Sequence, residues 1–359
     1  MERRRPGRPW AHRPRPLRVA VFTTSYPRDE RDASGRFVAD AVERLRGQGV
    51  RVEVVHPALR GEGGLVAKLR RRPWLAPSFV YRSVRALRRA DCDLVHAHWL
   101  LSGAIAVLAR KPFVLTLHGS GSAGAFSDLE LARRAPRLVA AIVTRARLLI
   151  CVSESLAAAA RSCGARDVRV IPNGVEIPDE TGVDAEPLEI LYAGRLSPEK
   201  GIEELAEAFR GHNLVVAGDG PLRELVPQAL GFLSPAELAE RYRRAAVVVC
   251  PSRSEGFGVV CAEAMAHGKP VVATSVGGLK ELVRHARTGF LVEPRNPAAL
   301  RVAVNLLLGD EELRRRLGAN ARAEAARFAW PAVTEATVDA YHSALGIEAP
   351  TPAPVEAAA

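Results

Sequence analysis

The feature that most constrains the fold is an apolar run from Ala246 to Cys250 that leads directly into a glycine-rich loop. A short, unbroken apolar run is typical of a parallel strand with both faces buried. The residues after the loop predict a helix that ends at Gly268, because Pro270 just beyond it is a normal stop signal. A buried strand followed by a helix is the repeating unit of a doubly wound α/β sheet.

The loop carries the residue types of a ligand site. Glu255 falls at the carboxyl end of the predicted strand, where open α/β sheets bind ligands. The string Gly256-Phe257-Gly258 lets the backbone approach a bound molecule and opens the helix with its amides facing outward. Glu263 lies about two helical turns further on. Carboxylates in these two places could bind hydroxyl groups at both ends of a folded ligand, with the helix N-terminus aimed at a phosphate.

The strand and helix pattern occurs in two halves. The first half has a strand from Arg18, a helix over about 36–46 and a strand over 50–55, and the pattern begins again at Leu188. We therefore predict an α/β protein with two Rossmann-like, doubly wound domains. The expected boundaries are a tail over 1–16, a first domain over 17–175, an acidic hinge over 176–187, a second domain over 188–328, a terminal helix over 329–345 and a tail over 346–359.

The second half opens with a candidate phosphate site. A strand that ends at Arg195 is followed by Ser197 and Pro198, which predict a helix with serine as N-cap and proline at its first position. Arg195 and Lys200 would then flank the positive end of that helix. A solvated lysine is the ordinary alternative, but two cations beside a free helix terminus suit a diphosphate.

Two strings in this sequence resemble those of a known family. Residues 255–272, Glu-Gly-Phe-Gly-x4-Glu-Ala-Met-Ala-x-Gly-x-Pro-Val-Val, are similar to the Glu-x7-Glu signature of retaining GT-B glycosyltransferases, family 4 in particular. The string Gly-Arg-Leu-Ser-Pro-Glu-Lys-Gly over 194–201 is a second match, and the resemblance covers about residues 17–345. It implies two domains that face each other across a cleft, a donor site in the second, an acceptor site in the first, and a terminal helix that crosses back to the first.

The resemblance also implies an activity and the roles of particular residues. Members of this family move a sugar from a nucleoside diphosphate to a hydroxyl acceptor and retain the anomeric configuration. His118, at a strand end beside the donor sugar, and Glu255, at the sugar hydroxyls, are the expected catalytic residues. The remaining expected contacts are Gly256, Phe257 and Gly258 for the sugar, Arg195, Lys200 and Gly35 for the diphosphate, and Glu263 and Val260 for the nucleotide.

The expected mechanism uses neither a cofactor nor a metal. No carboxylate is clearly placed as a covalent nucleophile, which fits the ion-pair-like retaining mechanism that the resemblance implies. Charge developing on the leaving diphosphate must be offset by a metal or by protein cations, and Arg195 and Lys200 are the better candidates. Asp91-Cys92-Asp93 has the lettering of a metal site, but it precedes a strand and so faces the wrong end of the sheet. Metal binding by His96 and His98, on one face of a strand, stays open as an alternative.

Other classes of protein share parts of this pattern. A GT-B sugar-nucleotide epimerase, or a sugar-nucleotide-binding protein without activity, would have the same architecture. A nicotinamide dehydrogenase would need Gly-x-Gly-x-x-Gly after the first strand, and residues 23–35 do not provide it. No recognisable nucleic-acid module is present, so nucleic acid is not expected as a partner.

The net charge of +11 is unevenly placed and suggests a further partner. The segment 65–90 places basic residues among Trp74, Phe79 and aliphatic side chains and contains no acid. We hypothesise that it contacts an anionic membrane, where the enzyme would glycosylate a lipid-linked or cell-envelope acceptor. A solvated face over ordinary core residues is the alternative, since Pro73 and Pro77 interrupt the helix that a membrane anchor prefers.

Cysteine usage and local composition complete the prediction. The five cysteines lack Cys-x-x-Cys spacing and lie mostly in apolar runs, which indicates reduced, buried thiols. Neither a secretory signal nor a spanning segment is recognisable, so we expect a cytoplasmic protein. The hypothesis of membrane contact would place it at the inner face of the cell membrane. One departure from the family is a short stretch over 222–230, where members usually have a full helix and strand. The loop near Gly231, which would meet the nucleotide base, is therefore expected to differ.

Overall fold

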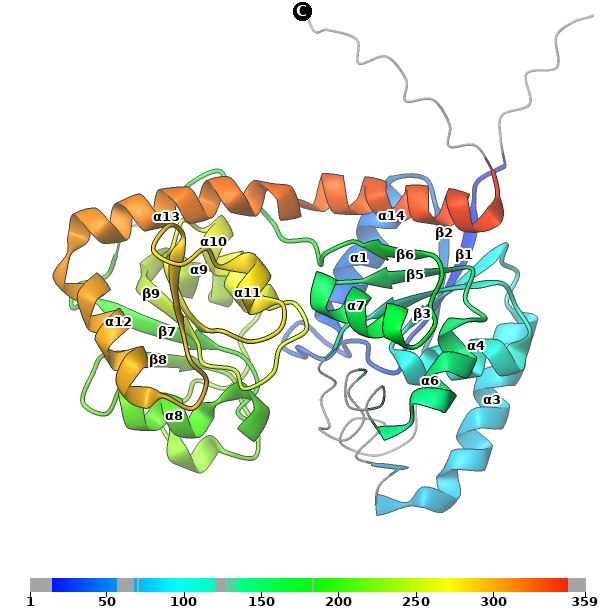
Figure 1. Ribbon diagram of the computed structural model, residues 1–359, viewed down its shortest axis with the longest axis horizontal. Helices are drawn as coiled ribbons and strands as arrows, with labels where there is room; N and C mark the ends of the chain where they lie inside the picture. The colour runs from blue at the N-terminus through cyan, green and yellow to red at the C-terminus, as the bar shows by residue number, and fades with distance from the viewer. Residues whose placement is uncertain are drawn as a thin grey trace, which may run out of the picture.

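The computed structural model describes residues 15–56, 68–69, 71–119, 128, 131, 134–182 and 184–347, and the predicted terminal tails and the segment 57–67 lie almost entirely outside them. Two parallel sheets lie side by side, with the second half of the chain at the left of Figure 1. The first sheet has the strand order β2-β1-β3-β4-β5-β6. Its strands are β1 (Arg18–Phe22), β2 (Arg51–Val55), β3 (Leu94–His98), β4 (Phe113–Leu117), β5 (Leu148–Cys151) and β6 (Val168–Val170).

Helices cover both faces of the first sheet because its strands are apolar on both sides. One set of strand residues, which includes Val21 and Leu94, packs with α1 and α14, and the alternate set, which includes Phe22 and Val95, packs with α3, α4, α6 and α7. The short β6 lies at the sheet edge. The elements of this half are α1 (Arg36–Gly47), η1 (Pro73–Leu75), α3 (Ala76–Arg89), α4 (Leu100–Ala109), α6 (Pro136–Val143) and α7 (Glu154–Ser162).

The second sheet has the order β11-β10-β9-β7-β8. Its strands are β7 (Glu189–Ala193), β8 (Leu214–Ala217), β9 (Ala245–Cys250), β10 (Val271–Thr274) and β11 (Gly289–Val292). Alternate strand residues pack against α8 and α12 on one face and against α9, α10 and α11 on the other. The surrounding elements are η3 (Pro198–Lys200), α8 (Ile202–Ala208), η4 (Arg223–Leu225), α9 (Pro235–Arg244), α10 (Val259–Ala266), α11 (Leu279–Leu282), α12 (Pro297–Gly309), α13 (Glu311–Ala325), η5 (Ala326–Phe328) and α14 (Trp330–Leu345).

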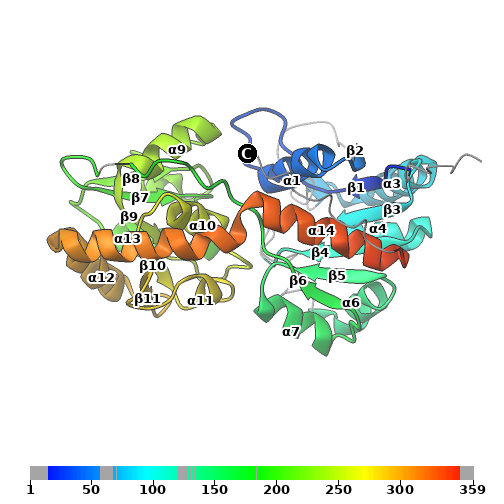
Figure 2. The ribbon, with the colours of Figure 1, turned by 90° about the horizontal axis from the view of Figure 1, so that it is seen from above.

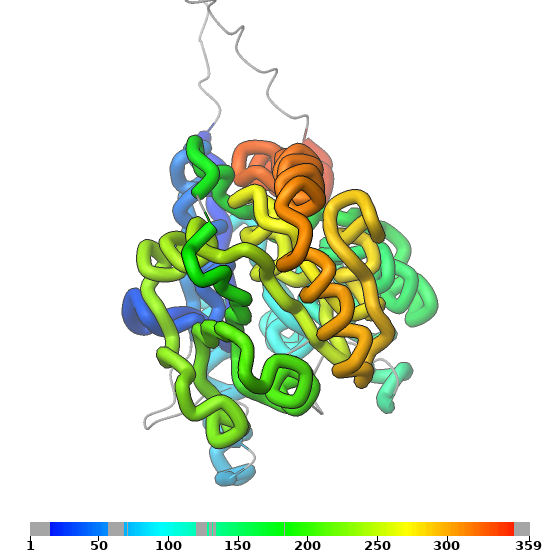
Figure 3. Tube along the Cα trace, turned by 90° about the vertical axis from the view of Figure 1, so that its left-hand side faces the viewer, coloured from blue at the N-terminus to red at the C-terminus, as the bar shows by residue number. Residues whose placement is uncertain are grey.

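A nearly continuous helical arm joins the two halves. Figure 2 shows α13 on the second sheet and α14 on the first, separated by a short break at η5 and Ala329. In Figure 3 the two helices run one behind the other along the top of the molecule. Ala329 pairs with Val175, the residue after Gly174, and Trp330 packs so closely on Gly174 that a Cβ there would overlap the indole ring. The chain therefore crosses between the halves twice at one place.

In both sheets the carboxyl ends of the strands face the space between the halves. In each sheet the first strand has neighbours on both sides, β2 and β3 around β1 and β8 and β9 around β7, and the connections leave it in opposite directions. Ligands of open α/β sheets bind outside the carboxyl ends of the strands at such a reversal of strand order. The loops after β1, β3, β4, β7 and β9 are therefore the part of the fold in which to look for a site.

The predicted fold class is confirmed, and one local prediction is wrong. Ser197 does not cap a helix with its side chain: η3 is a single turn, and α8 begins only at Ile202, after Gly201. Gly201 has a φ of 70° and lies against the Pro251 carbonyl group, where a Cβ would overlap the oxygen. Because this left-handed residue interrupts the helix, the turn that carries Lys200 is separate from α8.

Other sequence predictions can be checked directly. The stretch 222–230 contains η4 and no α-helix or strand, as its length predicts, and Gly231 forms an isolated bridge with Gly218. The helix α9 that follows was not predicted, although Ser234 and Glu237 form a capping box. All five cysteines are free. Within the described ranges, no helix combines the length and apolar character needed to cross a bilayer.

The crossing point generates a prediction about stability. Gly174→Ala adds a methyl group against the Trp330 ring and should lower the apparent Tm by a few degrees, because overpacking a tight contact costs about 1–3 kcal/mol. Gly309→Ala is the control, since a Cβ at Gly309 meets nothing within 4 Å and alanine favours a helix. Thermal unfolding followed by circular dichroism compares the two variants. Equal Tm values for both would contradict this account of the crossing.

Candidate active site

An ion pair between Lys200 and Glu255 lies at the carboxyl ends of β7 and β9. The Lys200 Nζ atom is 2.6 Å from the Glu255 Oε2 atom, and the Ser252 hydroxyl lies 3.4 Å from the same oxygen. Both charged side chains are largely buried, with 24% and 13% of their side-chain surface exposed. Burial alone would lower the pKa of Lys200, but the Glu255 carboxylate outweighs it and the pKa is raised. Lys200 is therefore a permanent cation at this edge of the second sheet.

The loop that carries Glu255 touches the first half of the chain directly. A Cβ added to Gly256 would overlap the carbonyl oxygen of His118, and a Cβ on Gly119 would meet the Gly256 Cα atom at 2.7 Å. Gly258, with a φ of 99°, then begins α10. Only glycine permits both the close approach and the positive φ, so this string holds the backbone of the two halves in contact.

The remaining residues expected to bind the donor sugar and diphosphate differ in exposure. Phe257 is buried and packs edge-on against Phe328 at 5.4 Å, so its backbone, and not its ring, is available to a ligand. Arg195 is exposed after β7, and its guanidinium group forms no hydrogen bond or ion pair with the described residues. The hydroxyl of Ser197, between Arg195 and Lys200, is buried without a hydrogen-bond partner in the described structure. Sequence reasoning had treated Ser197 only as a helix cap.

Gly35 lies at the N-terminus of α1 in a left-handed conformation, with a φ of 70°. A Cβ at this position would overlap the Ser25 carbonyl oxygen, so the glycine keeps the loop after β1 folded against itself. In the first turn of α1, the centroid of the Phe37 ring lies 4.8 Å from the centroid of the His118 ring. The predicted diphosphate residue of the first half thus lies on the element that packs against the predicted catalytic histidine.

Glu263 lies on α10 together with Val260, as the spacing predicts. Its Oε2 atom accepts a 2.8 Å hydrogen bond from the Tyr242 hydroxyl of α9, a partner that sequence reasoning missed. Burial raises the pKa of Glu263 to about 7; the Tyr242 bond opposes this shift, and the charge of Asp40 on α1 adds to it. Val260 is partly buried against the neighbouring apolar cluster. Within the part of the chain that the structure describes, the second carboxylate therefore differs from Glu255 in having no cationic partner.

His118 is a buried, neutral histidine at the end of β4. Burial, with a smaller contribution from His96, lowers its pKa to about 3. The Asp128 carboxylate accepts hydrogen bonds from the backbone amides of His118, Gly119 and Leu100 at 2.9, 3.2 and 3.0 Å, which fixes the end of β4 beside the start of α4. The Nδ1 atom of His118 is buried and has no partner in the described structure. The ring of His118 is therefore fixed in position, and its Nδ1 atom remains available for a hydrogen bond to a ligand.

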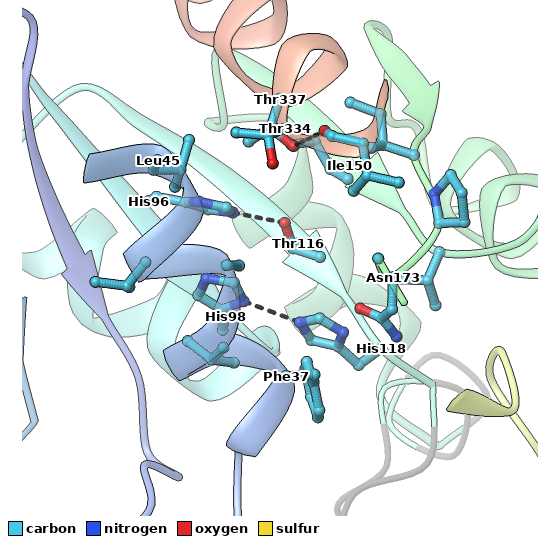
Figure 4. Close-up of a pocket in the computed structure, with 18 of the residues that line it drawn as sticks. Phe37, Leu45, His96, His98, Thr116, His118, Ile150, Asn173, Thr334 and Thr337 are labelled. Atoms are coloured by element: carbon cyan, nitrogen blue, oxygen red, sulfur yellow. Dashed lines mark hydrogen bonds between the residues drawn. The ribbon is translucent and has the colours of Figure 1, made fainter. Parts of the chain in front are cut away.

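A cavity of about 50 Å³ lies beneath this histidine, between the first sheet, α1 and α14. His96, His98, Thr116 and His118 are among its lining residues, and Figure 4 shows Asn173 near His118. Most of the lining is apolar. The cavity thus borders the end of β4, and the polar side chains that line it include the three histidines and Thr116.

Two polar contacts close the flanks of the space between the halves. The Glu281 carboxylate of α11 accepts hydrogen bonds from the backbone amides of Glu154 and Ser155 at 2.8 and 2.9 Å, which caps the N-terminus of α7. On the other side, Arg31 forms a 2.9 Å ion pair with Glu237 of α9. Together with the Gly256 contact, these interactions hold the two sheet edges against each other.

The residues considered as metal ligands have other partners. Asp91 and Asp93 both pair with the Arg18 guanidinium group at the amino end of the first sheet, at 2.5 and 2.7 Å. His96 hydrogen-bonds to Tyr341 and to Thr116, and His98 to His118. Among the residues that the structure describes, no group of three or more His, Cys, Asp or Glu side chains is arranged to hold a metal ion.

Comparisons with known proteins agree with this geometry. The family model for Glycosyltransferase Family 4 matches residues 34–177, and the model for Glycosyl transferases group 1 matches residues 175–324. The chain is 30% identical to a D-inositol 3-phosphate glycosyltransferase of Acidothermus cellulolyticus, over 94% of this chain and 92% of that protein. It is 33% identical to an uncharacterised glycosyltransferase of Methanocaldococcus jannaschii, over 66% of this chain and 72% of that one.

Among solved structures, a sucrose-phosphate synthase of Thermosynechococcus elongatus superposes with a TM-score of 0.75 at 25% identity, over 92% of this chain and 99% of that one. The fold and the site thus define a GT-B glycosyltransferase. The chain belongs to the family 4 glycosyltransferases, as the two sequence strings predicted.

The raised pKa of Glu263 generates a prediction about pH. Because the folded protein holds the Glu263 proton up to a pKa of about 7, against an ordinary value of 4.5, stability without ligand should fall as pH rises from about 4.5 to about 7. Glu263→Gln cannot ionise and keeps an acceptor for Tyr242. The variant should therefore gain apparent Tm relative to the wild type across this window.

Asp40→Asn provides the control for this measurement. Burial raises the pKa of Asp40 to about 6, so this carboxyl titrates in an overlapping range and must be separated from Glu263. The Tm of the wild type and of both single variants is measured from pH 4 to pH 9. Parallel curves for the wild type and Glu263→Gln would show that Glu263 does not carry a raised pKa.

Proposed function

We propose that this glycosyltransferase transfers a sugar from a nucleoside-diphosphate sugar to a hydroxyl acceptor, with retention of the anomeric configuration and without a metal ion. The observation that carries the proposal is the buried Lys200–Glu255 pair, which lies at the strand ends of the second sheet where its backbone touches His118. A cation for phosphate and a carboxylate for hydroxyl groups are the two charges that a sugar diphosphate requires.

Donor binding would exchange partners within this pair. The Lys200 ammonium would turn from Glu255 to the diphosphate, and the freed carboxylate would accept hydrogen bonds from sugar hydroxyls. Arg195 is exposed beside this position, and its guanidinium group has no partner among the described residues; the N-terminus of α10, whose amides could also face a phosphate, follows the Gly256 loop. These groups would stabilise the negative charge that develops as the bond to the sugar breaks, which is the part that a metal has in other transferases.

The neutral state of His118 limits what it can do. With a pKa of about 3 it is not an imidazolium at neutral pH, so it has no acidic proton to give to a leaving group. It would instead orient the donor sugar through its free nitrogen. The acceptor oxygen would attack the anomeric carbon from the face that the diphosphate leaves, and the leaving phosphate oxygen would take the acceptor proton. No carboxylate nucleophile is needed, and retention follows from attack on the same face.

The choice of acceptor would belong to the first half of the chain. The Acidothermus relative is named for a small polyol phosphate. We nevertheless propose an acceptor at an anionic membrane surface, because Trp74 and Tyr81 are 70% and 63% exposed on η1 and α3, beside exposed Arg82 and Arg85. Exposed aromatic side chains next to arginines suit the interfacial region of such a bilayer. Residues 65–67 and Arg70 of the predicted basic segment, and residues 57–64 before it, lie outside the described residues.

The transfer proposal is tested with sugar nucleotides and simple hydroxyl acceptors in the presence of EDTA. We expect turnover to persist, and the anomeric proton coupling in the NMR spectrum of the product to show the configuration of the donor. Lys200→Ala should reduce turnover by tens- to a thousandfold, since a lost charge-assisted contact to phosphate costs about 2–4 kcal/mol.

The control for this test is Lys111→Ala. Lys111 lies before β4, at the opposite end of that strand from His118, and donates only to the Ala90 carbonyl group among the described residues. Its replacement should leave turnover unchanged. An inverted product, loss of activity in EDTA with rescue by magnesium, or full activity in Lys200→Ala would each contradict the part of the mechanism concerned.

The membrane proposal is tested by flotation with liposomes. The wild type should float with anionic vesicles and not with neutral ones, since each arginine near anionic headgroups contributes about 1 kcal/mol. The variant Trp74→Ser, Tyr81→Ser, Arg82→Ser, Arg85→Ser should stay in the soluble fraction. The matched control changes exposed residues of α12 and α13: Val302→Ser, Leu306→Ser, Arg315→Ser, Arg316→Ser. Equal flotation of both variants, or none of the wild type, would favour a soluble acceptor.

A further inference from the structure

The ends of β3 and β4 bring a second histidine against His118. His98 aligns with Thr116 in the parallel register of these strands, so His98 and His118 share the face that α1 and α14 cover. The His98 Nδ1 atom lies 2.9 Å from the His118 Nε2 atom. The two rings are within 11° of parallel, with centroids 5.2 Å apart. Nitrogens 2.9 Å apart are closer than two stacked ring faces can come, so the rings meet edge to edge in a hydrogen bond.

This bond contains one proton. Burial lowers the pKa of both histidines far below neutrality, so each imidazole carries a single N–H group. In one arrangement His98 donates and the free Nδ1 of His118 carries a proton. In the other, His118 donates from Nε2 and its Nδ1 is left as an acceptor. The position of this one proton therefore decides which kind of hydrogen bond His118 can form with a ligand.

The burial of His118 favours the second arrangement. Its Nδ1 atom is buried and has no partner in the described structure. A buried donor without an acceptor is rarer in proteins than a buried acceptor without a donor, because an acceptor lone pair is less costly to leave unsatisfied. The Nδ1 atom is thus expected to bear a lone pair, and the Nε2–H group to donate to His98.

The neighbouring side chains fix the ring of His98. His96, two residues earlier on β3, packs against His98 with a centroid distance of 4.2 Å. Both nitrogens of His96 are held at 2.6 Å, one by the Tyr341 hydroxyl of α14 and the other by the Thr116 hydroxyl of β4. Figure 4 shows His96 and His98 side by side, with His98 directed at His118. His96, itself fixed by two hydrogen bonds, therefore holds the ring of His98 in place.

We propose that His98 is a positioning residue that accepts the Nε2 proton of His118 and so keeps the Nδ1 atom of His118 as a hydrogen-bond acceptor for a hydroxyl group of the donor sugar. The inference rests on the proposed function, in which His118 lies beside that sugar. Positive charge develops on the sugar ring during transfer. A lone pair directed at the sugar does not destabilise this charge, whereas the positive end of an N–H group would. The hydrogen bond from the sugar would satisfy the nitrogen that is unpaired in the free protein.

The first test reads the tautomer without any assay of activity. In protein labelled with ¹⁵N-histidine, long-range proton–nitrogen NMR spectra should show His118 protonated at Nε2 and bare at Nδ1, with its signals assigned through His118→Gln. In His98→Leu the acceptor is lost and both nitrogens of His118 lack a partner, so the preference for Nε2 should weaken and part of the population should carry the proton on Nδ1. His98→Asn, whose amide oxygen can accept near the original Nδ1 position, should restore the wild-type pattern.

The second test separates positioning from a general loss of structure. His98→Leu should lower kcat/KM for the sugar nucleotide by about tenfold, the scale of one misdirected hydrogen bond, and His98→Asn should recover most of it. The affinity for the free nucleoside diphosphate, which has no sugar, should be unchanged. Ser83→Ala is the matched control, because it removes a buried hydrogen bond to the Phe79 carbonyl group on α3, which packs on the opposite face of the first sheet, and it should alter neither the His118 spectrum nor kcat/KM.

Several results would overturn the inference. These are a wild-type His118 that carries its proton on Nδ1, an unchanged His118 spectrum in His98→Leu, or a His98→Asn variant that behaves like His98→Leu. A parallel loss of nucleoside diphosphate affinity would show that His98 only supports the fold. If the wild type transfers no sugar from any nucleotide, the proposed function fails, and the NMR comparison still decides whether His98 sets the tautomer.

Discussion

The contact between Gly256 and the His118 carbonyl group is the constraint on which the site depends. Two sheets that end in loops would ordinarily be kept apart by their side chains, and here a Cβ at Gly256 would already be too large. Because backbone meets backbone, the residue after Glu255 touches His118, which is the proximity that the proposed function requires. The Glu281 cap on α7 and the Arg31–Glu237 pair then act at the flanks of a contact that glycine makes possible.

The charges of the site are arranged so that each can change partner. Lys200 and Glu255 neutralise one another in the free protein, which lowers the cost of burying either charge before a ligand arrives. Glu263 accepts from the neutral Tyr242 hydroxyl and keeps its proton up to about neutral pH. A ligand with a diphosphate and several hydroxyl groups could satisfy both carboxylates and the cation together. Specificity would then arise because partial ligands leave one of these groups unpaired.

Sequence reasoning predicted the parts of the site that depend on neighbours along the chain. The strand β9, the Glu255 loop and α10 lie within about 25 residues, so spacing and glycine positions were enough to place Glu255 and Glu263. The helix predicted to begin at Pro198 is interrupted because Gly201 must pass close to the Pro251 carbonyl group, a contact from a distant segment. The Tyr242 bond to Glu263 and the Glu281 cap on α7 likewise depend on packing between elements, which no local pattern contains.

The histidines of β3 and β4 lie between these two cases. The alternation of Leu94, His96 and His98 with apolar residues shows that both histidines share a face, and the same count places Thr116 and His118 together on β4. What the alternation lacks is the register: His98 pairs with Thr116, and this alignment places the His98 and His118 rings at hydrogen-bonding distance. A shift of one residue along the strand would turn His98 to the opposite face of the sheet. The state of the His118 nitrogen thus depends on how two strands align, and the ordinary packing of the first sheet becomes a condition for its chemistry.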